Sequence, residues 1–305
     1  MRLKQITILL FVLFSANINI KADEGTNWAD VTKRFVKNTD FNDGNYDGWT
    51  VESNAGQRTV SAKIMRFWNG TFNFSQEIIQ LPKGRYRLSV QGFYRANGDD
   101  YQSYKNGTED ITAFLYAGTA STPLVSVYSE AMTSTEGNRQ QHEGKYYPDN
   151  SVSAAAAFAE GNYKNNFLEF EAEGNITIGV RCEQAKSDNY CALDNFKLEY
   201  ASPIGPDGKS WIDMTDILIT NPGFTNNDKS GWEWHSNAHS ENASWDCMEF
   251  WNGTFNISQL IKDRPQGKYR LSVQSYYRCQ DNDRGYDNYK NGQEEITGYL
   301  YGADA

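Results

Sequence analysis

The sequence predicts an all-β protein, built from one complete and one partial copy of a β-sandwich. Aromatic residues make up 14% of the 305 residues, yet the mean hydropathy is only −0.71. This combination suits short strands that each have one polar face. Turn-forming Gly, Asn and Asp recur throughout, at the spacing of about 8–12 residues that is typical of sandwiches and barrels. A long internal repeat then sets the number of copies.

The repeat is nearly in register. Phe67–Asn73 returns as Phe250–Asn256, and Tyr86–Gln91 returns as Tyr269–Gln274, both at an offset of 183 residues. A period this long indicates a duplicated domain, because solenoid and propeller units are only about 20–50 residues long. No counterpart of residues 121–200 follows in the second copy, so we expect the second sandwich to be incomplete at its C-terminal side.

The first 22 residues are typical of an export signal. Arg2 and Lys4 precede the apolar run Ile6–Phe14, and Ala22 fits a cleavage point. The alternative is a buried N-terminal strand. The run is shorter than the about 20 residues of a membrane-spanning helix, and no later segment is apolar enough to span a bilayer. We therefore expect a secreted protein, periplasmic, extracellular or at the cell surface, without membrane insertion.

The chain divides accordingly into four parts. They are the signal at 1–22, a first domain at 23–200, a Pro- and Gly-containing linker at 201–210, and an incomplete second domain at 211–305. The formal net charge is −10. Because an acidic chain repels phosphate backbones and anionic lipid surfaces, nucleic acid is not an expected partner.

The elements of the first domain follow from alternation and turn residues. The expected strands are Phe72–Ile79, Arg85–Arg95, Ile111–Tyr116, Leu124–Tyr128, Phe167–Ala172, Ile176–Cys182 and Ala192–Tyr200. We expect turns at Leu81–Gly84 and Glu173–Asn175 and a loop over 129–150. Ser153–Glu160 is the predicted helix, because consecutive alanines favour it and Gly161 is placed to end it. This many short strands predicts a jelly roll.

Alternation within Arg85–Arg95 indicates a candidate binding face. The side assigned to the core carries Tyr86, Leu88, Val90 and Tyr94. The other side carries Arg87, Ser89, Gln91, Phe93 and Arg95, matched in the second copy by Arg270, Ser272, Gln274, Tyr276 and Arg278. A merely solvated face would be free to diverge between the copies. We therefore expect this side to be exposed and functional.

Several motifs resemble the galactose-binding-like jelly rolls of bacterial carbohydrate-binding modules. Asn38–Phe41 followed by Gly48-Trp49 resembles the start of that family, and Leu193–Leu198 resembles its last strand. Phe67–Gly70 and Gly161–Tyr163 resemble tandem non-catalytic domains of secreted Bacteroidetes surface proteins. The resemblance covers 28–200 and half a unit beyond. It implies the fold and a secreted bacterial context, while such folds host sugar binding, protein binding and spacer roles alike.

Flat rings beside hydrogen-bonding groups are what a sugar-binding site needs. Trp68 and Trp251 follow inward-facing phenylalanines, so we expect them to point outward; the alternative is packing against their own sandwich. The arginines and glutamines of the candidate face fit hydroxyls or a uronate carboxylate, and the alternative is cross-strand ion pairing. The predicted ligand-binding residues are Trp68, Arg87, Gln91, Phe93, Arg95, Trp251, Arg270, Gln274, Tyr276 and Arg278. Trp49 is expected in the core.

Two structural cross-links are also predicted. Asp194 in the last strand, with Asn38 and Asp40 from the first, fits the structural Ca²⁺ site that the resemblance implies. The alternative is that Asp194 accepts hydrogen bonds within a turn. Cys182 and Cys191 flank a short turn between two predicted strands, so a hairpin disulfide is feasible in an oxidising compartment.

No catalytic arrangement stands out in the sequence. His235 and His239 lie in a Gly-, Ser- and Asn-rich stretch, and no nucleophile–base pair or glycosidase carboxylate pair is recognisable. We expect a secreted, non-catalytic glycan-binding protein that is not itself an enzyme. One alternative is a structural or protein-interaction sandwich whose partner is an extracellular protein. Another is the accessory region of a glycoside hydrolase or protease with a catalytic domain beyond residue 305.

Overall fold

The computed structural model describes residues 5–8, 15–17, 26–203, 212–265, 267–278 and 282–302. The chain divides into two compact units: the first unit is residues 28–201, and the second unit is residues 1–27 together with 202–305. The predicted cleavage point at Ala22 and most of the predicted linker, 204–210, lie outside the described residues. Within the described residues, every helix is too short or too polar to cross a bilayer.

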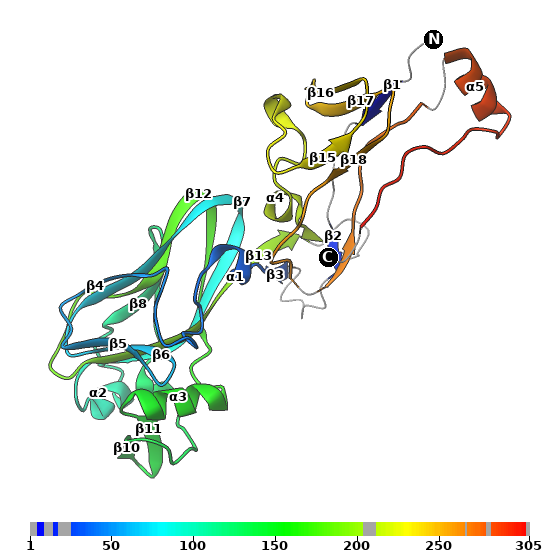
Figure 1. Cartoon of the computed structure of the whole chain (residues 1–305). Helices are drawn as coiled ribbons and strands as arrows, with labels where there is room; N and C mark the ends of the chain where they lie inside the picture. Colours follow the sequence, from blue (N-terminus) through cyan, green and yellow to red (C-terminus); the bar gives the residue numbers. More distant parts are fainter. Residues whose placement is uncertain are drawn as a thin grey trace. The chain divides into compact units, whose positions relative to one another are not determined.

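Antiparallel strands dominate the first unit (Figure 1). The strands are β3 (Thr26–Asp30), β4 (Thr50–Ser53), β5 (Gln57–Ser61), β6 (Ile64–Trp68), β7 (Phe72–Arg95), β8 (Ala113–Ala117), β9 (Ala120–Pro123), β10 (Arg139–His142), β11 (Lys145–Pro148), β12 (Asn166–Cys182) and β13 (Tyr190–Pro203). The helices are α1 (Thr32–Phe35), α2 (Tyr101–Lys105), the 3-10 helix η1 (Val127–Ser129) and α3 (Ser151–Glu160).

One large sheet, bent over on itself, makes the sandwich. Its order is β5-β6-β13-β7-β12-β8-β9, with β3 beside β13 and β4 beside β7. The N-terminal part of β7 pairs with β4, whereas its C-terminal part pairs with β13. Strand β12 pairs with both parts of β7, and with β8 only near its C-terminal end. The two long strands therefore belong to both layers, and the antiparallel strands around them form the predicted all-β sandwich.

Two predicted chain reversals are wrong. Leu81–Gly84 lies inside β7, and Glu173–Asn175 lies inside β12. The pairing of these strands shifts register on both sides of Gly174, which has a φ of 80°. Such irregularities bend a strand without ending it. The glycines of these segments therefore mark the bend between the layers, where the sequence pattern predicts turns.

The layers pack on an aromatic cluster. The ring of Trp49 stacks on that of Phe74 with 4.5 Å between centroids, and the rings of Phe41 and Phe196 pack on both. The indole N–H of Trp49 donates to the carbonyl oxygen of Lys37 at 2.9 Å. Trp49 is only 6% exposed, which confirms the prediction that it lies in the core.

The segment between β7 and β12 covers one outer face of the sandwich. The predicted loop 129–150 contains the β10–β11 hairpin, and the predicted strand Leu124–Tyr128 runs instead into η1. Helix α3 begins two residues before the predicted Ser153, after a capping box between Asn150 and Ser153, and ends before Gly161 as predicted. Figure 1 shows α2, α3 and the hairpin grouped beside β5 and β6. Their buried side chains form a second core with Ile64, Phe93, Tyr190 and Ala192 of the sheet.

The second unit repeats the beginning of this arrangement. Its elements are β1 (Gln5–Ile8), β2 (Ser15–Asn17), β14 (Ile212–Asp213), α4 (Thr215–Leu218), the 3-10 helix η2 (Thr225–Asn227), β15 (Glu233–Ser236), β16 (Ser240–Ser244), β17 (Cys247–Trp251), β18 (Phe255–Ser258), β19 (Lys268–Arg270) and α5 (Asn282–Lys290).

In this unit β1 and β2 take the place that β13 has in the first unit. β1 pairs with β17 so that Gln5 lies opposite Trp251, just as Tyr190 of β13 lies opposite Trp68 of β6. β2 pairs antiparallel with β19, as β13 pairs with β7. The described parts of the N-terminal segment are thus strands in this structure, while their removal as an export signal stays a prediction.

Candidate functional site

The strand face predicted to bind ligand is not exposed in the first unit. Phe93 is 0% exposed, Gln91 4% and Arg95 5%. Helix α3 and the residues after it pack on this side of β7, and the Phe93 ring contacts those of Phe158 and Tyr163. The prediction of an outward-facing platform is therefore wrong, because the sandwich has a third layer on this side.

The polar groups of this face are committed to internal partners. The side-chain amide of Gln91 donates to the carbonyl oxygens of Phe158 at 2.8 Å and Asn162 at 2.7 Å. The guanidinium of Arg95 is ion-paired with Asp149. These contacts fasten both ends of α3 to the sheet. The identity of these positions in the two copies is consistent with a packing requirement.

Arg87 adopts the alternative arrangement, a cross-strand ion pair. Its Nε lies 2.9 Å from Oε2 of Glu199, which is its direct neighbour on β13. Its guanidinium also lies over the ring of Trp28, 4.4 Å from the centroid. Arg87 therefore braces the sheet and is not available as a ligand-binding fork.

The matching residues of the second unit are less covered. Tyr276 is 57% exposed, Arg270 and Gln274 are exposed, and Arg278 is half-buried. The described part of this unit contains no counterpart of α3 to cover them. Their exposure follows from that missing layer and is no sign of a ligand.

The two predicted indoles differ. Trp68 is 37% exposed and lies between β5 and β13, as expected for an outward-pointing ring. Trp251 is half-buried between β1 and β16. Neither contributes to the cavity described below, and a single exposed indole does not make a site.

The predicted calcium ligands fit a cation in part. Burial, with a smaller contribution from the nearby charge of Asp40, raises the pKa of Asp194 to about 7, so the two carboxylates are close enough to repel. No basic side chain forms an ion pair with either in the described residues. Asn38, however, donates its amide to Asn45. Both carboxylates also accept local hydrogen bonds, Asp194 from the backbone and side-chain N–H groups of Asn195 and Asp40 from those of Asn42, so Asp194 makes the turn hydrogen bonds of the alternative.

The predicted disulfide is wrong in this structure: Cys182 and Cys191 are buried free thiols. Strands β12 and β13 lie on opposite sides of β7 instead of pairing with each other, so the turn between them is no hairpin. Burial raises the pKa of Cys182 to about 11, which makes its thiol a poor nucleophile at neutral pH.

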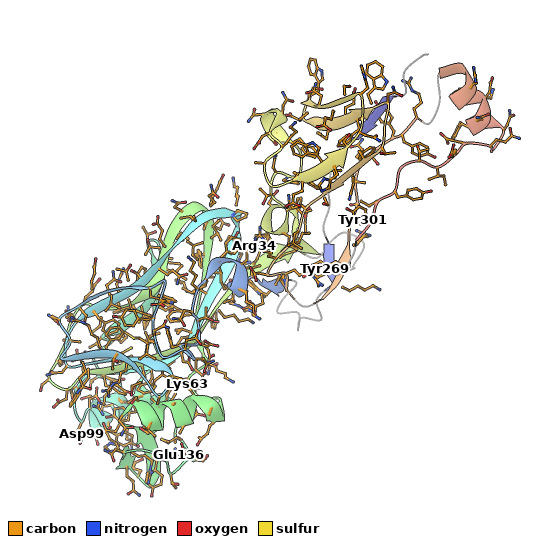
Figure 2. The ribbon with its side chains drawn as sticks, viewed as in Figure 1. Arg34, Lys63, Asp99, Glu136, Tyr269 and Tyr301 are labelled. Atoms are coloured by element: carbon orange, nitrogen blue, oxygen red, sulfur yellow. The ribbon has the colours of Figure 1, made fainter. Side chains whose placement is uncertain are left out.

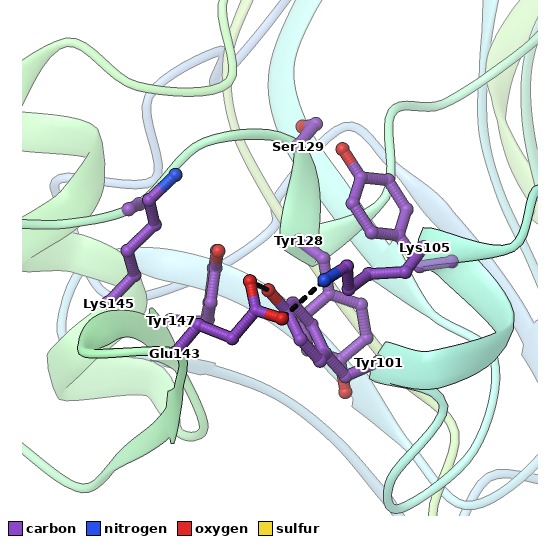
Figure 3. Close-up of a pocket in the computed structure, with 9 residues that line it drawn as sticks. Tyr101, Lys105, Tyr128, Ser129, Glu143, Lys145 and Tyr147 are labelled. Atoms are coloured by element: carbon purple, nitrogen blue, oxygen red, sulfur yellow. Dashed lines mark hydrogen bonds and ion pairs between the residues drawn. The ribbon is translucent and has the colours of Figure 1, made fainter.

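An open cavity of about 550 Å³ lies on the segment that covers the sandwich (Figure 3). Its lining residues are Tyr101, Tyr104, Lys105, Tyr128, Ser129, Ala131, Glu143, Lys145 and Tyr147. Four tyrosine rings and three charged groups thus converge from α2, η1 and the β10–β11 hairpin. We call this site the tyrosine cavity.

Local sequence explains how these side chains meet. Tyr101 and Tyr104 are three residues apart on α2, so they lie on one side of the helix. The β10–β11 hairpin turns at Glu143-Gly144, both with positive φ (52° and 77°). This is the type I′ turn that matches the twist of two strands. It leaves Glu143 and Lys145 on the hairpin opposite α2, as Figure 3 shows.

Stacked rings hold the floor of the cavity. The imidazole of His142 lies parallel to the ring of Tyr101, with 4.2 Å between centroids and 15° between planes. Tyr128 meets Tyr101 edge to face at 5.3 Å. Tyr147 packs on Tyr128 at 5.4 Å. A cluster of this kind fixes ring orientation before any ligand arrives.

Glu143 organises the polar side of the cavity. Its carboxylate accepts a hydrogen bond from the hydroxyl of Tyr101 at 3.1 Å and is ion-paired with Lys105, the dashed lines of Figure 3. The hydrogen bond from Lys105 is the main reason that the pKa of Glu143 lies below its ordinary value. Desolvation raises the pKa of Tyr147 to about 12. These shifts keep the phenol of Tyr147 neutral and the carboxylate of Glu143 ionised at neutral pH.

A pair of carboxylates lies close to these tyrosines. Asp100 is 3% exposed, and its Oδ2 accepts from the backbone N–H of Ala96. Glu109 accepts from the hydroxyls of Ser126 at 2.8 Å and Tyr94 at 3.2 Å. Burial raises the pKa of Glu109 to about 7, and the charge of Asp100 adds to the shift. Figure 2 shows Asp99, the neighbour of Asp100, at this end of the unit.

The tyrosine cavity is absent from the sequence predictions, although one signal pointed to it. The pattern Tyr101-x-x-Tyr104-Lys105 returns in the second copy as Tyr286-x-x-Tyr289-Lys290 on α5. There the two tyrosines are 61% and 66% exposed, since the described second unit has no counterpart of the β10–β11 hairpin. The cavity is therefore assembled only in the first unit among the described residues.

Comparison with known proteins gives a limited result. No family model matches the chain, and no curated protein matches it. Among solved structures, the chain is similar to that of TmCBM61 in complex with β-1,4-galactotriose, at 15% identity and a TM-score of 0.31. The similarity covers 54% of this chain and 96% of the other. At this score the similarity carries no functional weight.

Proposed function

We propose that the first unit is a non-catalytic carbohydrate-binding module of a secreted protein, and that glycan binds in the tyrosine cavity. The observation that carries the proposal is the convergence of four tyrosine rings with Lys, Glu and Ser side chains in one open cavity. The face of a phenol ring packs against the C–H side of a pyranose, and its hydroxyl reaches the sugar hydroxyls.

A binding role without catalysis agrees with the arrangement of the carboxylates. Hydrolysis of a glycoside by the usual route needs two carboxyl groups on opposite sides of the scissile bond. In the tyrosine cavity Glu143 is the single carboxylate among the lining residues, and it is held by Lys105. The neighbouring pair, Asp100 and Glu109, is engaged with Ala96, Ser126 and Tyr94. This favours retention of a glycan over its cleavage.

The test is affinity electrophoresis or a glycan array with the purified exported protein and two matched variants. Tyr104→Ala removes a ring at the rim of the cavity and leaves the stack of Tyr101 on His142 in place. Tyr46→Ala removes a ring that is 40% exposed at a distant loop of the same unit. Stacking on one ring contributes about 1 kcal/mol or more, so Tyr104→Ala should weaken retention at least about fivefold. Equal retention of both variants would count against the cavity.

Export of the protein belongs to the same proposal, as does a structural Ca²⁺ ion at Asp194 and Asp40. The charged start, short apolar run and Ala22 of the sequence support export. N-terminal sequencing of the protein from the culture medium or the periplasm tests it, with a start at residue 23 expected. A chain that keeps residues 1–22 in the cell would contradict it.

A protein-interaction role is the alternative for the second unit. Ile296, Tyr299 and Leu300 are 59%, 78% and 53% exposed. Tyr299 and Leu300 match Phe114 and Leu115 of β8, which pairs with β12 in the first unit. The described second unit has no counterpart of β12, so this segment is open to a partner. Sedimentation velocity of the full chain tests whether copies associate through this surface. Association that Tyr299→Ser and Leu300→Ser weaken would favour the interaction role.

A further inference from the structure

The tyrosine cavity has an excess of positive charge in a chain that is acidic as a whole. Its lining includes Lys105, Lys145 and Glu143, whereas the full sequence has a net charge of −10. Lys105 and Glu143 neutralise each other in an ion pair. Lys145 forms no ion pair with any residue that the structure describes. It is exposed on the hairpin, and Figure 3 shows it across the cavity from Lys105.

The acidic residues nearest to Lys145 in sequence, Glu143 and Asp149, are ion-paired with Lys105 and Arg95, and two further acids are held by backbone groups. The carboxylate of Glu130 accepts from the backbone N–H of Tyr163 at 2.9 Å. That of Glu160 accepts from the backbone N–H groups of Thr133 and Ser134. These interactions hold each acid to the backbone of a different segment of the chain. The ammonium of Lys145 forms no ion pair within the described residues, and the carboxylate whose charge it acts on, Glu143, is already paired with Lys105.

We propose that the tyrosine cavity selects an acidic glycan, in which a carboxylate or sulfate group on the sugar pairs with Lys145. This inference rests on the proposed glycan-binding function and specifies its ligand class. The tyrosine rings hold the pyranose, and Lys145 supplies the charge-assisted hydrogen bond that a neutral sugar leaves unused. The two arginines expected from the sequence to bind a uronate, Arg87 and Arg95, are locked in ion pairs.

The net negative charge of the chain also predicts how the affinity for an acidic glycan depends on salt concentration. At long range its negative charge repels an acidic polysaccharide, and salt screens that repulsion. At contact, salt weakens the pair between Lys145 and the ligand. Affinity for an acidic glycan should therefore depend on Lys145 most strongly at low ionic strength.

Calorimetry with two forms of one oligosaccharide tests the inference. An α-1,4-linked galacturonic acid trimer carries carboxylates, and its fully methyl-esterified form has the same backbone without charge. A glycan array with uronic, sulfated and neutral members widens the range. The variants are Lys145→Ala and Lys33→Ala, the latter removing an equal charge from α1 of the same unit. Near-UV circular dichroism confirms that each variant keeps its tyrosine packing.

We expect acidic members to bind about tenfold or more tightly than their neutral matches, the range of a charge-assisted hydrogen bond. Lys145→Ala should remove that preference, and Lys33→Ala should leave it. Retention of neutral glycans with no effect of Lys145→Ala overturns the inference but leaves glycan binding standing. Retention of no glycan, or retention that Tyr104→Ala does not change, overturns glycan binding in the cavity and this inference together.

Discussion

The side chain of Gln91 donates to the carbonyl oxygen of Phe158 at 2.8 Å, joining a sandwich strand to the last turn of α3. A second donation reaches the carbonyl oxygen of Asn162, just beyond the helix, at 2.7 Å. The Phe158 carbonyl also accepts from the backbone N–H of Gly161 at 2.9 Å, so Gln91 adds a second donor to a carbonyl of the last helical turn. Gln91 thus ties the end of α3 to the sheet, and it keeps the segment that carries the tyrosine cavity in place.

Gln91→Ala should therefore destabilise the first unit. The carbonyl oxygen of Asn162 would lose its Gln91 donor, and that of Phe158 would keep only the N–H of Gly161; an unsatisfied buried polar group costs about 1–3 kcal/mol. Gln102→Ala is the matched control, because Gln102 is exposed on α2. Urea unfolding followed by tyrosine and tryptophan fluorescence measures both. A Gln91→Ala midpoint equal to that of the control would refute this role of Gln91.

Stability should fall as pH rises from about 4.5 to 7. Burial raises the pKa of Glu109 from 4.5 to about 7, so the folded state holds a proton that the unfolded chain has already released over this interval. The folded state is then favoured below the interval and loses that advantage across it. Because Glu109 is only half-buried, solvent screening reduces the full value of about 1.4 kcal/mol per pKa unit, and the expected loss is about 2 kcal/mol or less.

The measurement is the unfolding midpoint from pH 4 to 8 for the protein and for Glu109→Gln. The amide cannot ionise, so it should flatten most of the slope attributable to this residue. Asp194, whose pKa burial also raises to about 7, contributes a slope of the same sign. A Glu109→Gln profile parallel to that of the parent would rule out Glu109 as a source.

Calcium should stabilise the first unit if Asp194 and Asp40 hold it. A bound cation relieves the repulsion that helps to raise the pKa of Asp194, and ligand binding to the folded state raises the midpoint by mass action. We expect a higher thermal midpoint with millimolar Ca²⁺ at pH 8, a smaller gain at pH 6, and none in Asp194→Asn. A midpoint insensitive to both Ca²⁺ and a chelator would remove the site.

Loss of residues 1–22 should loosen the edge of β17. In this structure β1 lies against that strand with Ile6 opposite Phe250, in the position that β13 occupies beside β6. Hydrogen exchange should therefore be faster at Cys247–Trp251 in the exported form than in the full-length chain. Ile64–Trp68 serves as the internal control, since β13 stays in place there. Identical exchange in both forms would show that β1 does not protect this edge.

Alternation in the sequence identified correctly which side of β7 faces the other layer: Tyr86, Leu88 and Val90 are 0–1% exposed. It could not show that the opposite side is covered too. A period of two separates the two sides of a strand but does not count the layers packed on them. The cover comes from residues 97–163, whose packing depends on contacts far apart in the chain.

The Asn-Gly pair kept in both copies has a local explanation that needs no ligand. A Cβ on Gly70 would lie 2.3 Å from Cα of Ala55, and one on Gly253 would lie 2.5 Å from Cα of Ala238. Only glycine allows two backbones to approach so closely. Identity between the two copies at this position therefore reflects a packing requirement of the fold. The cavity residues, by contrast, come from three separate segments, and the sequence pattern does not show that these segments meet.

Strands β7 and β12 each run through both layers. Two sheets joined only by loops can slide past each other when the ends of a domain are pulled. Here that motion would require the long β7–β12 ladder to break along its length. We expect the first unit to unfold under mechanical shear only at high force. A molecule held by a bound glycan would then stay folded and attached in flowing liquid.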